Sequence, residues 1–79
     1  MPQATAEPVE ANLAIWLVDT GIVKSRREAR EFISNGAISI NGEKVTDVDA
    51  TISPETAFGG KYVVVRRGKK NYWLVTYTD

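Results

Sequence analysis

Apolar residues recur at helical spacing in a short segment near the start of the chain. Leu13, Trp16 and Leu17 follow Asn12, a residue type that favours the N-cap of a helix. Gly21 then supplies a residue able to take the left-handed conformation that often ends a helix. The pattern predicts a first helix between Asn12 and Gly21.

A second helix is predicted to begin directly after Ser25. Ser25 and Glu28 have the spacing of a capping box, in which the hydroxyl accepts from the third helical amide and the carboxylate reaches back to the cap. Asn35-Gly36 supplies residues suited to ending this helix. The apolar stripe of the helix consists of Ala29, Phe32 and Ile33.

Alternating apolar positions then predict two hairpins. Ile38 and Ile40 precede Asn41-Gly42, the strongest short signal for a type I′ turn. Residues 62–67 and 72–78 are rich in β-branched and aromatic side chains, and the Gly-Lys-Lys-Asn segment between them predicts a hairpin with a basic tip. Between the hairpins, a Gly- and Pro-containing stretch predicts irregular backbone from 47 to 60. Its expected core anchors are Val48 and Ile52.

Residues 1–11 contain two prolines and no apolar periodicity, so we expect a flexible leader or linker outside the core. Residues 12–79 then form one domain. The order of elements predicts a small α+β fold, with a helix pair packed on one end of an antiparallel sheet that contains two hairpins.

Composition limits the function classes. A chain of 79 residues, with 43% hydrophobic and 25% charged residues, holds one small globular domain. Because it has no cysteine and no histidine, we expect no disulfide, zinc cluster or thiol nucleophile. Its carboxylates lie in capping, surface and loop contexts and no Gly-rich phosphate loop is present, so we expect no catalytic residue and no cofactor. The longest apolar stretch, residues 13–18, is far short of the roughly 20 residues that cross a bilayer. We therefore expect a cytoplasmic protein without membrane contact.

The net charge of zero conceals a segregated pattern. Residues 1–23 and 45–60 each carry a net charge of minus three, whereas residues 24–44 carry plus two and residues 61–79 carry plus four. Local rather than average charge decides attraction to a polyanion, because salt screens over about 8 Å. If the two basic segments converge on one side of the folded domain, they form a site for a sugar-phosphate backbone.

The basic segment on the second helix has the chemistry of a phosphate site. Arg26 and Arg30 are four residues apart and share one face, while Lys24 and Ser25 lie at the helix N-terminus, where amides and the macrodipole favour an anion. The alternative is a solvated helix face with an Arg27–Glu31 ion pair.

The aromatic residues of the second hairpin also have two interpretations. They could stack on unpaired bases or fill the core, and strand alternation favours burial of at least one set. The residues are Tyr62, Tyr72, Trp73 and Tyr77.

Residues 24–45, with the sequence KSRREAREFISNGAISINGEKV, resemble the RNA-binding module of small-subunit ribosomal protein S-four and of many RNA-modifying and RNA-charging proteins. Residues 60–75 and 17–21 are similar to the carboxyl terminus of bacterial tyrosyl-tRNA synthetase, the tyrosine-tRNA ligase. Together the resemblance covers residues 12–77. It departs from many members in the first helix, which lacks a basic residue and is therefore expected to be a packing element.

The resemblance implies an S-four-like (alpha-L) RNA-binding domain that is itself not an enzyme, detached from an ATP-dependent ligase. It implies two kinds of partner. One is tyrosine tRNA, held at the anticodon stem and long variable arm. The other is the set of catalytic and anticodon-binding domains of a homodimeric parent, whereas the fragment itself is expected to be a monomer. By position, the resemblance carries RNA contact onto Lys24, Ser25, Arg26, Arg30, Asn35 and Gly36, with Lys44 adjacent by hairpin geometry. The charge pattern extends this patch to Arg27, Arg66, Arg67, Lys69 and Lys70.

Two other functions stay open from the residues. One is an RNA-binding appendage of a pseudouridine synthase or ribosome-associated protein, which would bind ribosomal RNA. The other is a protein-interaction module with an exposed apolar patch at Trp16, Phe58 or Trp73.

Overall fold

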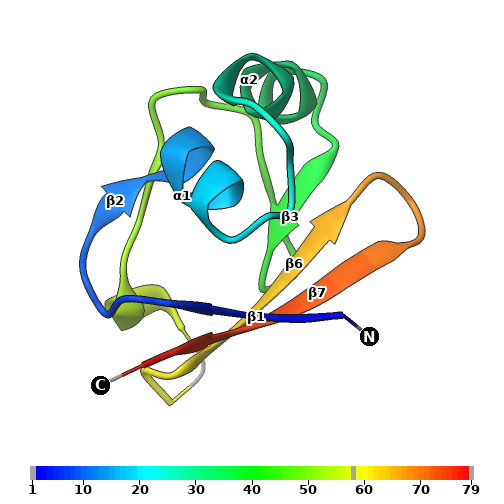
Figure 1. Cartoon of the computed structure of the whole chain (residues 1–79). Coiled ribbons are helices and arrows are strands. Elements are labelled where there is room, and N and C mark those ends of the chain that lie inside the picture. Colours follow the sequence, from blue (N-terminus) through cyan, green and yellow to red (C-terminus); the bar gives the residue numbers. More distant parts are fainter. Residues whose placement is uncertain (1, 58, 79) are drawn as a thin grey trace.

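The computed structural model describes residues 2–57 and 59–78, and it consists of a five-stranded sheet with two helices on one face (Figure 1). The strand order is β1-β7-β6-β3-β4. In chain order, the elements are β1 (Gln3–Ala6), β2 (Ala11–Asn12), α1 (Leu13–Asp19), α2 (Arg26–Ser34), β3 (Ile38–Ile40), β4 (Glu43–Val45), β5 (Thr51–Ile52), the 3-10 helix η1 (Pro54–Thr56), β6 (Tyr62–Arg67) and β7 (Asn71–Tyr77). The α+β prediction with a helix pair and two hairpins is confirmed.

Both predicted helices begin at their predicted caps. The Asn12 Oδ1 accepts from the amides of Ala14 (3.0 Å) and Ile15 (3.3 Å) at the start of α1. The Ser25 Oγ accepts from the amide of Glu28 (3.2 Å) at the start of α2. These bonds satisfy amides that have no partner inside the helix, which explains why the local sequence fixes both helix starts.

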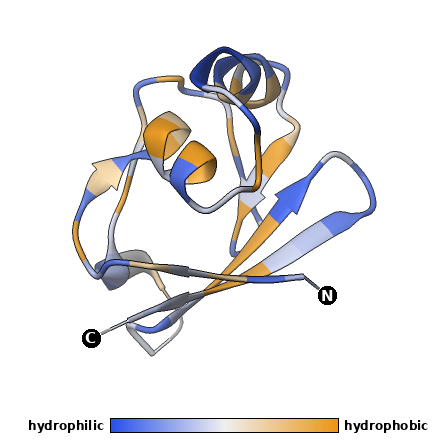
Figure 2. Cartoon of the chain, viewed as in Figure 1, coloured by the Kyte–Doolittle hydropathy of each residue, from blue (hydrophilic) through white to orange (hydrophobic). Residues whose placement is uncertain are grey.

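The core lies between the helices and the sheet. Leu17 of α1, Ile33 of α2, and Ile38, Val63 and Val75 of the sheet are fully buried. In the hydropathy view most of α1 is coloured hydrophobic, whereas much of α2 is coloured hydrophilic (Figure 2). The apolar stripe of α2 is confirmed by the burial of Ala29 and Ile33, with Phe32 partly buried at its margin.

The two hairpins join through the antiparallel pairing of β3 with β6. Asn41 and Gly42 both have positive φ, 52° and 88°, as a type I′ turn requires. The β6–β7 hairpin pairs Tyr62 with Thr76 at one end and Arg67 with Asn71 at the other, so its basic tip is residues 68–70.

The predicted leader at residues 1–11 is wrong for residues 3–6. These form β1, which lies parallel to β7 with Ala4 opposite Val75, and Ala4 and Ala6 pack against the core. The sheet is therefore mixed rather than purely antiparallel. The partner strand lies about 70 residues away in the chain, so no local pattern indicates the pairing.

The predicted loop at 47–60 is mostly irregular, as expected, but it contains β5 and η1. β5 pairs with β2, which places Ile52 in the core at 3% exposure, and Val48 packs partly against it. Both predicted anchors are confirmed. No described helix has the length and apolar character needed to cross a membrane.

Candidate nucleic-acid interface

The N-terminus of α2 is ordered by reciprocal capping. The Ser25 hydroxyl caps the Glu28 amide, and the Glu28 carboxylate accepts from the amide of Lys24 at 3.5 Å rather than from that of Ser25. Lys24, Ser25 and Arg26 are all exposed. The cap therefore sets the direction of the first turn while leaving its basic side chains in solvent.

Arg26 and Arg30 lie on the same flank of α2, as their spacing predicts. Both border a hollow of about 350 Å³ that Asn12, the N-cap of α1, Ile15 of α1 and Asp49 of the 46–50 loop also line. These three residues were not predicted at the site, because the tertiary packing of α1 and the loop, and no local motif, brings them there. Two exposed arginines and one aspartate are therefore among the residues that line this hollow.

The Arg27–Glu31 ion pair of the alternative interpretation does not form. Among the described residues, no Lys or Arg nitrogen lies within 4.0 Å of a carboxylate oxygen. We call Lys24, Arg26, Arg27 and Arg30 the helix group. Its charges are not neutralised by direct pairing, which favours an external anion over a purely self-compensated surface.

A second basic group forms at the other end of α2. Gly36, with φ of 72°, ends the helix, and a Cβ at this position would lie 3.2 Å from Lys44 Cδ and 3.6 Å from Lys44 Nζ. The amide of Gly68 donates to the carbonyl of Ala37 at 2.7 Å, which fixes the tip of the β6–β7 hairpin beside the same turn. We call Lys44, Lys69 and Lys70, together with the adjoining Asn35-Gly36 turn, the turn group.

Arg67 is part of the packing rather than of the solvent-facing groups. Its guanidinium lies 4.8 Å from the ring centroid of Trp73 and 5.6 Å from that of Phe32, and its Nη1 donates to the carbonyl of Ile22 at 2.6 Å. Ile22 lies in the segment that joins α1 to α2. Arg67 thus ties the last hairpin to the segment that leads into the helix group.

Arg66, the neighbouring residue, points to the opposite face of the sheet. Its Nη2 donates to Ser39 Oγ at 3.3 Å across the β3–β6 pair. Strand alternation separates the two arginines, so the run Arg66-Arg67 does not act as one patch.

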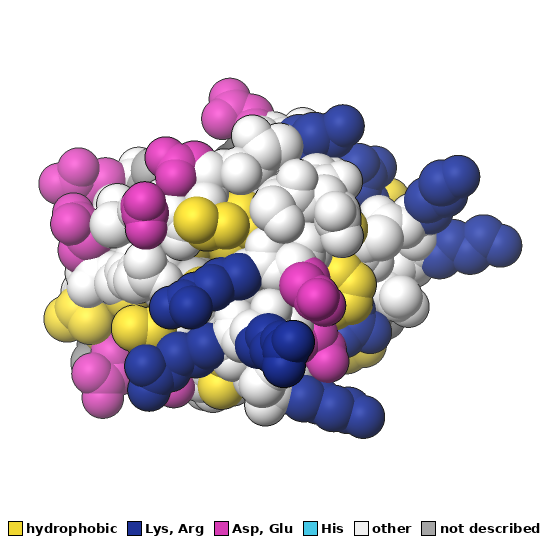
Figure 3. Space-filling view, turned by 90° about the horizontal axis from the view of Figure 1, so that it is seen from above, with side chains coloured by type: hydrophobic (Ala, Val, Ile, Leu, Met, Phe, Trp, Pro, Cys, Tyr) yellow, Lys and Arg dark blue, Asp and Glu magenta, His cyan; other side chains and the backbone are white. Residues whose placement is uncertain are grey.

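The two groups are on the side of the domain that carries the helices, but they do not form an unbroken basic surface. Viewed from that side, Lys and Arg side chains lie in the centre and toward the right, with acidic side chains between them and a larger acidic gathering at the left (Figure 3). The nine residues of α2 span roughly 13 Å, which sets the separation of the groups along the helix.

The aromatic residues divide as strand alternation predicts. Tyr77 is 3% exposed and Trp73 is half-buried under Arg67, whereas Tyr62 and Tyr72 are exposed on the other face. Burial raises the pKa of the Tyr77 hydroxyl, because an apolar environment disfavours the phenolate. Trp16 is 3% exposed, so it offers no apolar docking patch, and Phe58 lies outside the described residues.

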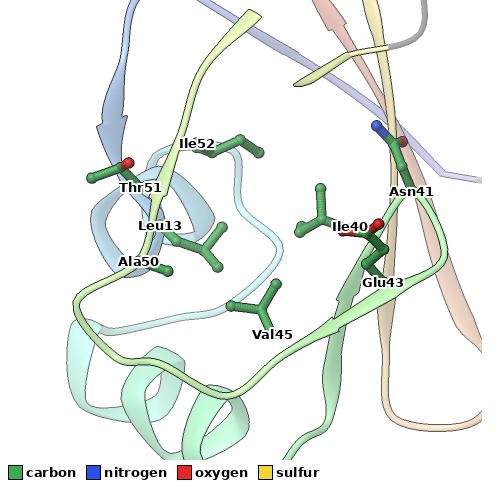
Figure 4. A pocket seen from close by; sticks show the side chains of 8 residues that line it. All are labelled: Leu13, Ile40, Asn41, Glu43, Val45, Ala50, Thr51 and Ile52. Atoms are coloured by element: carbon green, nitrogen blue, oxygen red, sulfur yellow. The ribbon is translucent and has the colours of Figure 1, made fainter. Parts of the chain in front are cut away.

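A separate hollow of about 470 Å³ lies between α1, the β3–β4 hairpin and β5. Leu13, Ile40, Val45 and Ile52 point toward one another across it, and Glu43 is the charged residue in its lining (Figure 4). Because its lining contains no Lys or Arg, this hollow is unsuited to phosphate and is distinct from both basic groups. Among the described residues, no group of three His, Cys, Asp or Glu residues is placed to hold a metal ion.

Comparison with known proteins identifies the family and the fold of this domain. The family model for the tyrosine–tRNA ligase SYY-like C-terminal domain matches residues 1–75. The chain belongs to this family. The predicted resemblance is therefore confirmed, and it now includes β1, which the predicted leader left out.

Relatives of this C-terminal domain are similar over nearly the whole chain. The tyrosine–tRNA ligase of Limosilactobacillus fermentum is 61% identical over 72 residues, or 91% of this chain and 17% of that protein. The tyrosine–tRNA ligase of Pediococcus pentosaceus is 60% identical over 75 residues, or 94% of this chain and 18% of that protein. The chain thus spans less than a fifth of these relatives, and it matches their non-catalytic C-terminal domain.

A solved structure agrees with the assignment of the chain to the tyrosine–tRNA ligase C-terminal domain. The solution structure of a tyrosyl-tRNA synthetase C-terminal domain superposes with a TM-score of 0.80 at 44% sequence identity, covering 99% of this chain and 79% of that one.

Proposed function

We propose that the chain binds tyrosine tRNA through its helix-bearing side, with the helix group and the turn group each holding phosphates of the backbone. The observation that carries this proposal is the pair of exposed, unpaired arginines, Arg26 and Arg30, on one flank of a capped helix. Arginine forks match phosphate oxygens in two parallel hydrogen bonds, and the positive end of α2 adds to the attraction. The family assignment supports tRNA as the class of ligand.

The remaining basic residues take different parts in this proposal. At the C-terminal end of α2, the RNA backbone contacts Lys44, Lys69 and Lys70. The Asn35-Gly36 turn lets the RNA backbone approach the protein closely there. Arg67 positions the segment that leads into the helix group, because its guanidinium is already held by Ile22 and two rings. Arg66 lies on the opposite face of the sheet, so this proposal gives it no contact with the tRNA.

In the intact ligase, this binding holds the tRNA outside the catalytic body, at the anticodon stem and the long variable arm. We place the domain at the C-terminal end of a homodimeric, cytoplasmic enzyme, whose other domains bind ATP, tyrosine and the anticodon. The isolated domain itself is a monomer without catalytic activity.

The direct test is the affinity of the 79-residue chain for fluorescein-labelled tyrosine tRNA, measured by anisotropy. Arg26→Ala and Arg30→Ala are each expected to weaken binding roughly 10-fold, because each removes a charge-assisted contact. Val9→Asp is the matched control: it changes the net charge by the same one unit, at an exposed position between Glu7 and Glu10. We expect less than a 2-fold effect from it.

Equal losses in all three variants would contradict the proposed site, because they would reflect net charge alone. Competition with a ribosomal RNA fragment separates the tRNA function from that of a ribosome-associated appendage. We expect tyrosine tRNA to displace the fragment, and preferred binding of the fragment would overturn the assignment of the ligand.

A further inference from the structure

The sheet has an outer face that neither helix covers (Figure 1). Inward-pointing residues such as Val63, Val65 and Val75 are buried in the core, so the alternate residues point outward. The side chains of this outer face belong to Gln3, Thr5, Ser39, Lys44, Tyr62, Val64, Arg66, Tyr72, Leu74 and Thr76.

Two exposed aromatic rings flank an apolar centre on this outer face. Val64 and Leu74 are cross-strand partners and are half-buried. Along the strands, Tyr62 lies on one side of the Val64–Leu74 pair and Tyr72 on the other, and their side chains are 44% and 40% exposed. Four residues of strand separate their positions along the sheet, about 13 Å. Lys61 Nζ lies 5.9 Å from the centroid of the Tyr62 ring, and at this exposure both rings still present surface to solvent for stacking.

The charge of the outer face has one sign. A cross-strand row runs from Lys44 through Ser39 and Arg66 to Tyr72. The bond from Arg66 to Ser39 fixes the guanidinium in this row, and the Arg66 Nε has no hydrogen-bond partner. None of the ten outer side chains is a carboxylate, although the whole chain has as many acidic as basic residues.

We propose that the outer face binds unpaired bases of single-stranded RNA. Tyr62 and Tyr72 stack on bases, while Arg66 and Lys44 meet the phosphates between and beside them. Stacking on aromatic rings within a basic groove is how proteins hold single strands without reading their sequence. A protein partner would have to supply carboxylates for the two cations, whereas RNA supplies negative charge and flat rings together. The two tyrosines and Arg66 lie outside the helix and turn groups, and Lys44, at the edge of the sheet, is shared with the turn group.

The test compares two fluorescein-labelled probes on the 79-residue chain, octauridine and an abasic octamer that carries the same phosphates without bases. Uridine is chosen because it stacks weakly on itself. We expect the chain to bind octauridine at least about 10-fold more tightly, because stacking contributes about 1–3 kcal/mol per base. The double variant Tyr62→Leu/Tyr72→Leu keeps apolar area and removes the rings, so it should lose this preference. Equal affinity for the two probes, or a preference that survives in the variant, would overturn the proposal.

Amide chemical shifts of the wild-type chain test the proposed RNA site even if the double variant does not fold. Octauridine should shift the amides of residues 62–66 and 72–76, and the abasic octamer should not. Shifts confined to the helix side, or no binding at all, would refute an RNA site on the sheet. The variants Arg26→Ala and Arg30→Ala test the tRNA proposal separately, so each proposal can fail while the other stands.

Discussion

Two basic regions of similar composition are held in opposite ways. On α2, Arg26 and Arg30 are exposed and reach no carboxylate, so their donors remain free for a ligand. On β6, by contrast, the guanidinium of Arg67 is held between two rings and donates to a buried backbone carbonyl. The difference shows that a run of basic residues does not define a binding surface. The neighbours of each guanidinium decide whether it stabilises the fold or is available to an anion.

The largest expected effect is on stability, from Arg67→Ala. This change removes cation–π contacts with Trp73 and Phe32 and leaves the Ile22 carbonyl without its donor. We expect the free energy of unfolding to fall by about 3 kcal/mol. Urea denaturation followed by tryptophan fluorescence measures the loss, with Lys69→Ala at the exposed tip as a control that should leave stability unchanged. A loss below about 1 kcal/mol would mean that Arg67 is not structural.

The next effect is on the salt dependence of tRNA binding. With about five phosphate contacts, the logarithm of affinity should fall with the logarithm of salt concentration at a slope of roughly −3.5 to −4.5. The double variant Arg26→Ala/Arg30→Ala should flatten this slope by roughly 1.5 to 2, because it removes two contacts. Anisotropy titrations at several salt concentrations measure both slopes. Identical slopes would show that these arginines do not neutralise phosphates.

Substitutions at Ser25 separate capping from binding. Ser25→Ala removes the acceptor for the Glu28 amide and should lower the free energy of unfolding by about 1 kcal/mol. Ser25→Asp keeps a good cap and should retain stability, but it places a negative charge within the helix group. We therefore expect tRNA binding to fall more in Ser25→Asp than in Ser25→Ala. Thermal unfolding and anisotropy together test this, and equal binding in the two variants would argue against a phosphate at this helix end.

The smallest expected effect concerns the buried side chain of Tyr77, which, unlike the guanidinium of Arg67, makes no hydrogen bond. Its hydroxyl has no hydrogen-bond partner, so Tyr77→Phe should change the free energy of unfolding at pH 7 by less than about 0.5 kcal/mol. Burial raises its pKa above the usual 10.0, so its contribution to stability is full below pH 10 and is lost as pH rises through the folded-state pKa.

The difference in stability between wild type and Tyr77→Phe isolates this titration from those of the other tyrosines and lysines. We expect wild type to lose stability relative to Tyr77→Phe above about pH 10. Denaturation between pH 8 and pH 11 measures it. A parallel pH dependence of the two proteins would contradict burial as the cause.

Local chemistry accounts for what could be predicted from the sequence. Asn12, Ser25 and Asn41-Gly42 act on amides or turns within a few residues, so the helix starts and the first hairpin turn follow from short motifs. β1 could not be predicted, because Gln3–Ala6 is short and its partner strand lies at the other end of the chain.

The same distinction applies to the candidate site. The shared flank of Arg26 and Arg30 follows from helical spacing, and the resemblance in residues 24–45 implies RNA as the ligand class. The engagement of Arg67 with Ile22 and Phe32 depends on contacts between segments 35 to 45 residues apart. Charge counting therefore assigned Arg67 to the binding patch, whereas packing gives it a structural role.

The most direct test of the central claim is the change in amide chemical shifts of the ¹⁵N-labelled chain on addition of tyrosine tRNA. If the helix group and the turn group hold the backbone, residues 24–30, 35–36, 44 and 69–70 should shift together, while the acidic segment at residues 7–10 stays unchanged. Binding that leaves residues 24–30 unshifted would contradict the account.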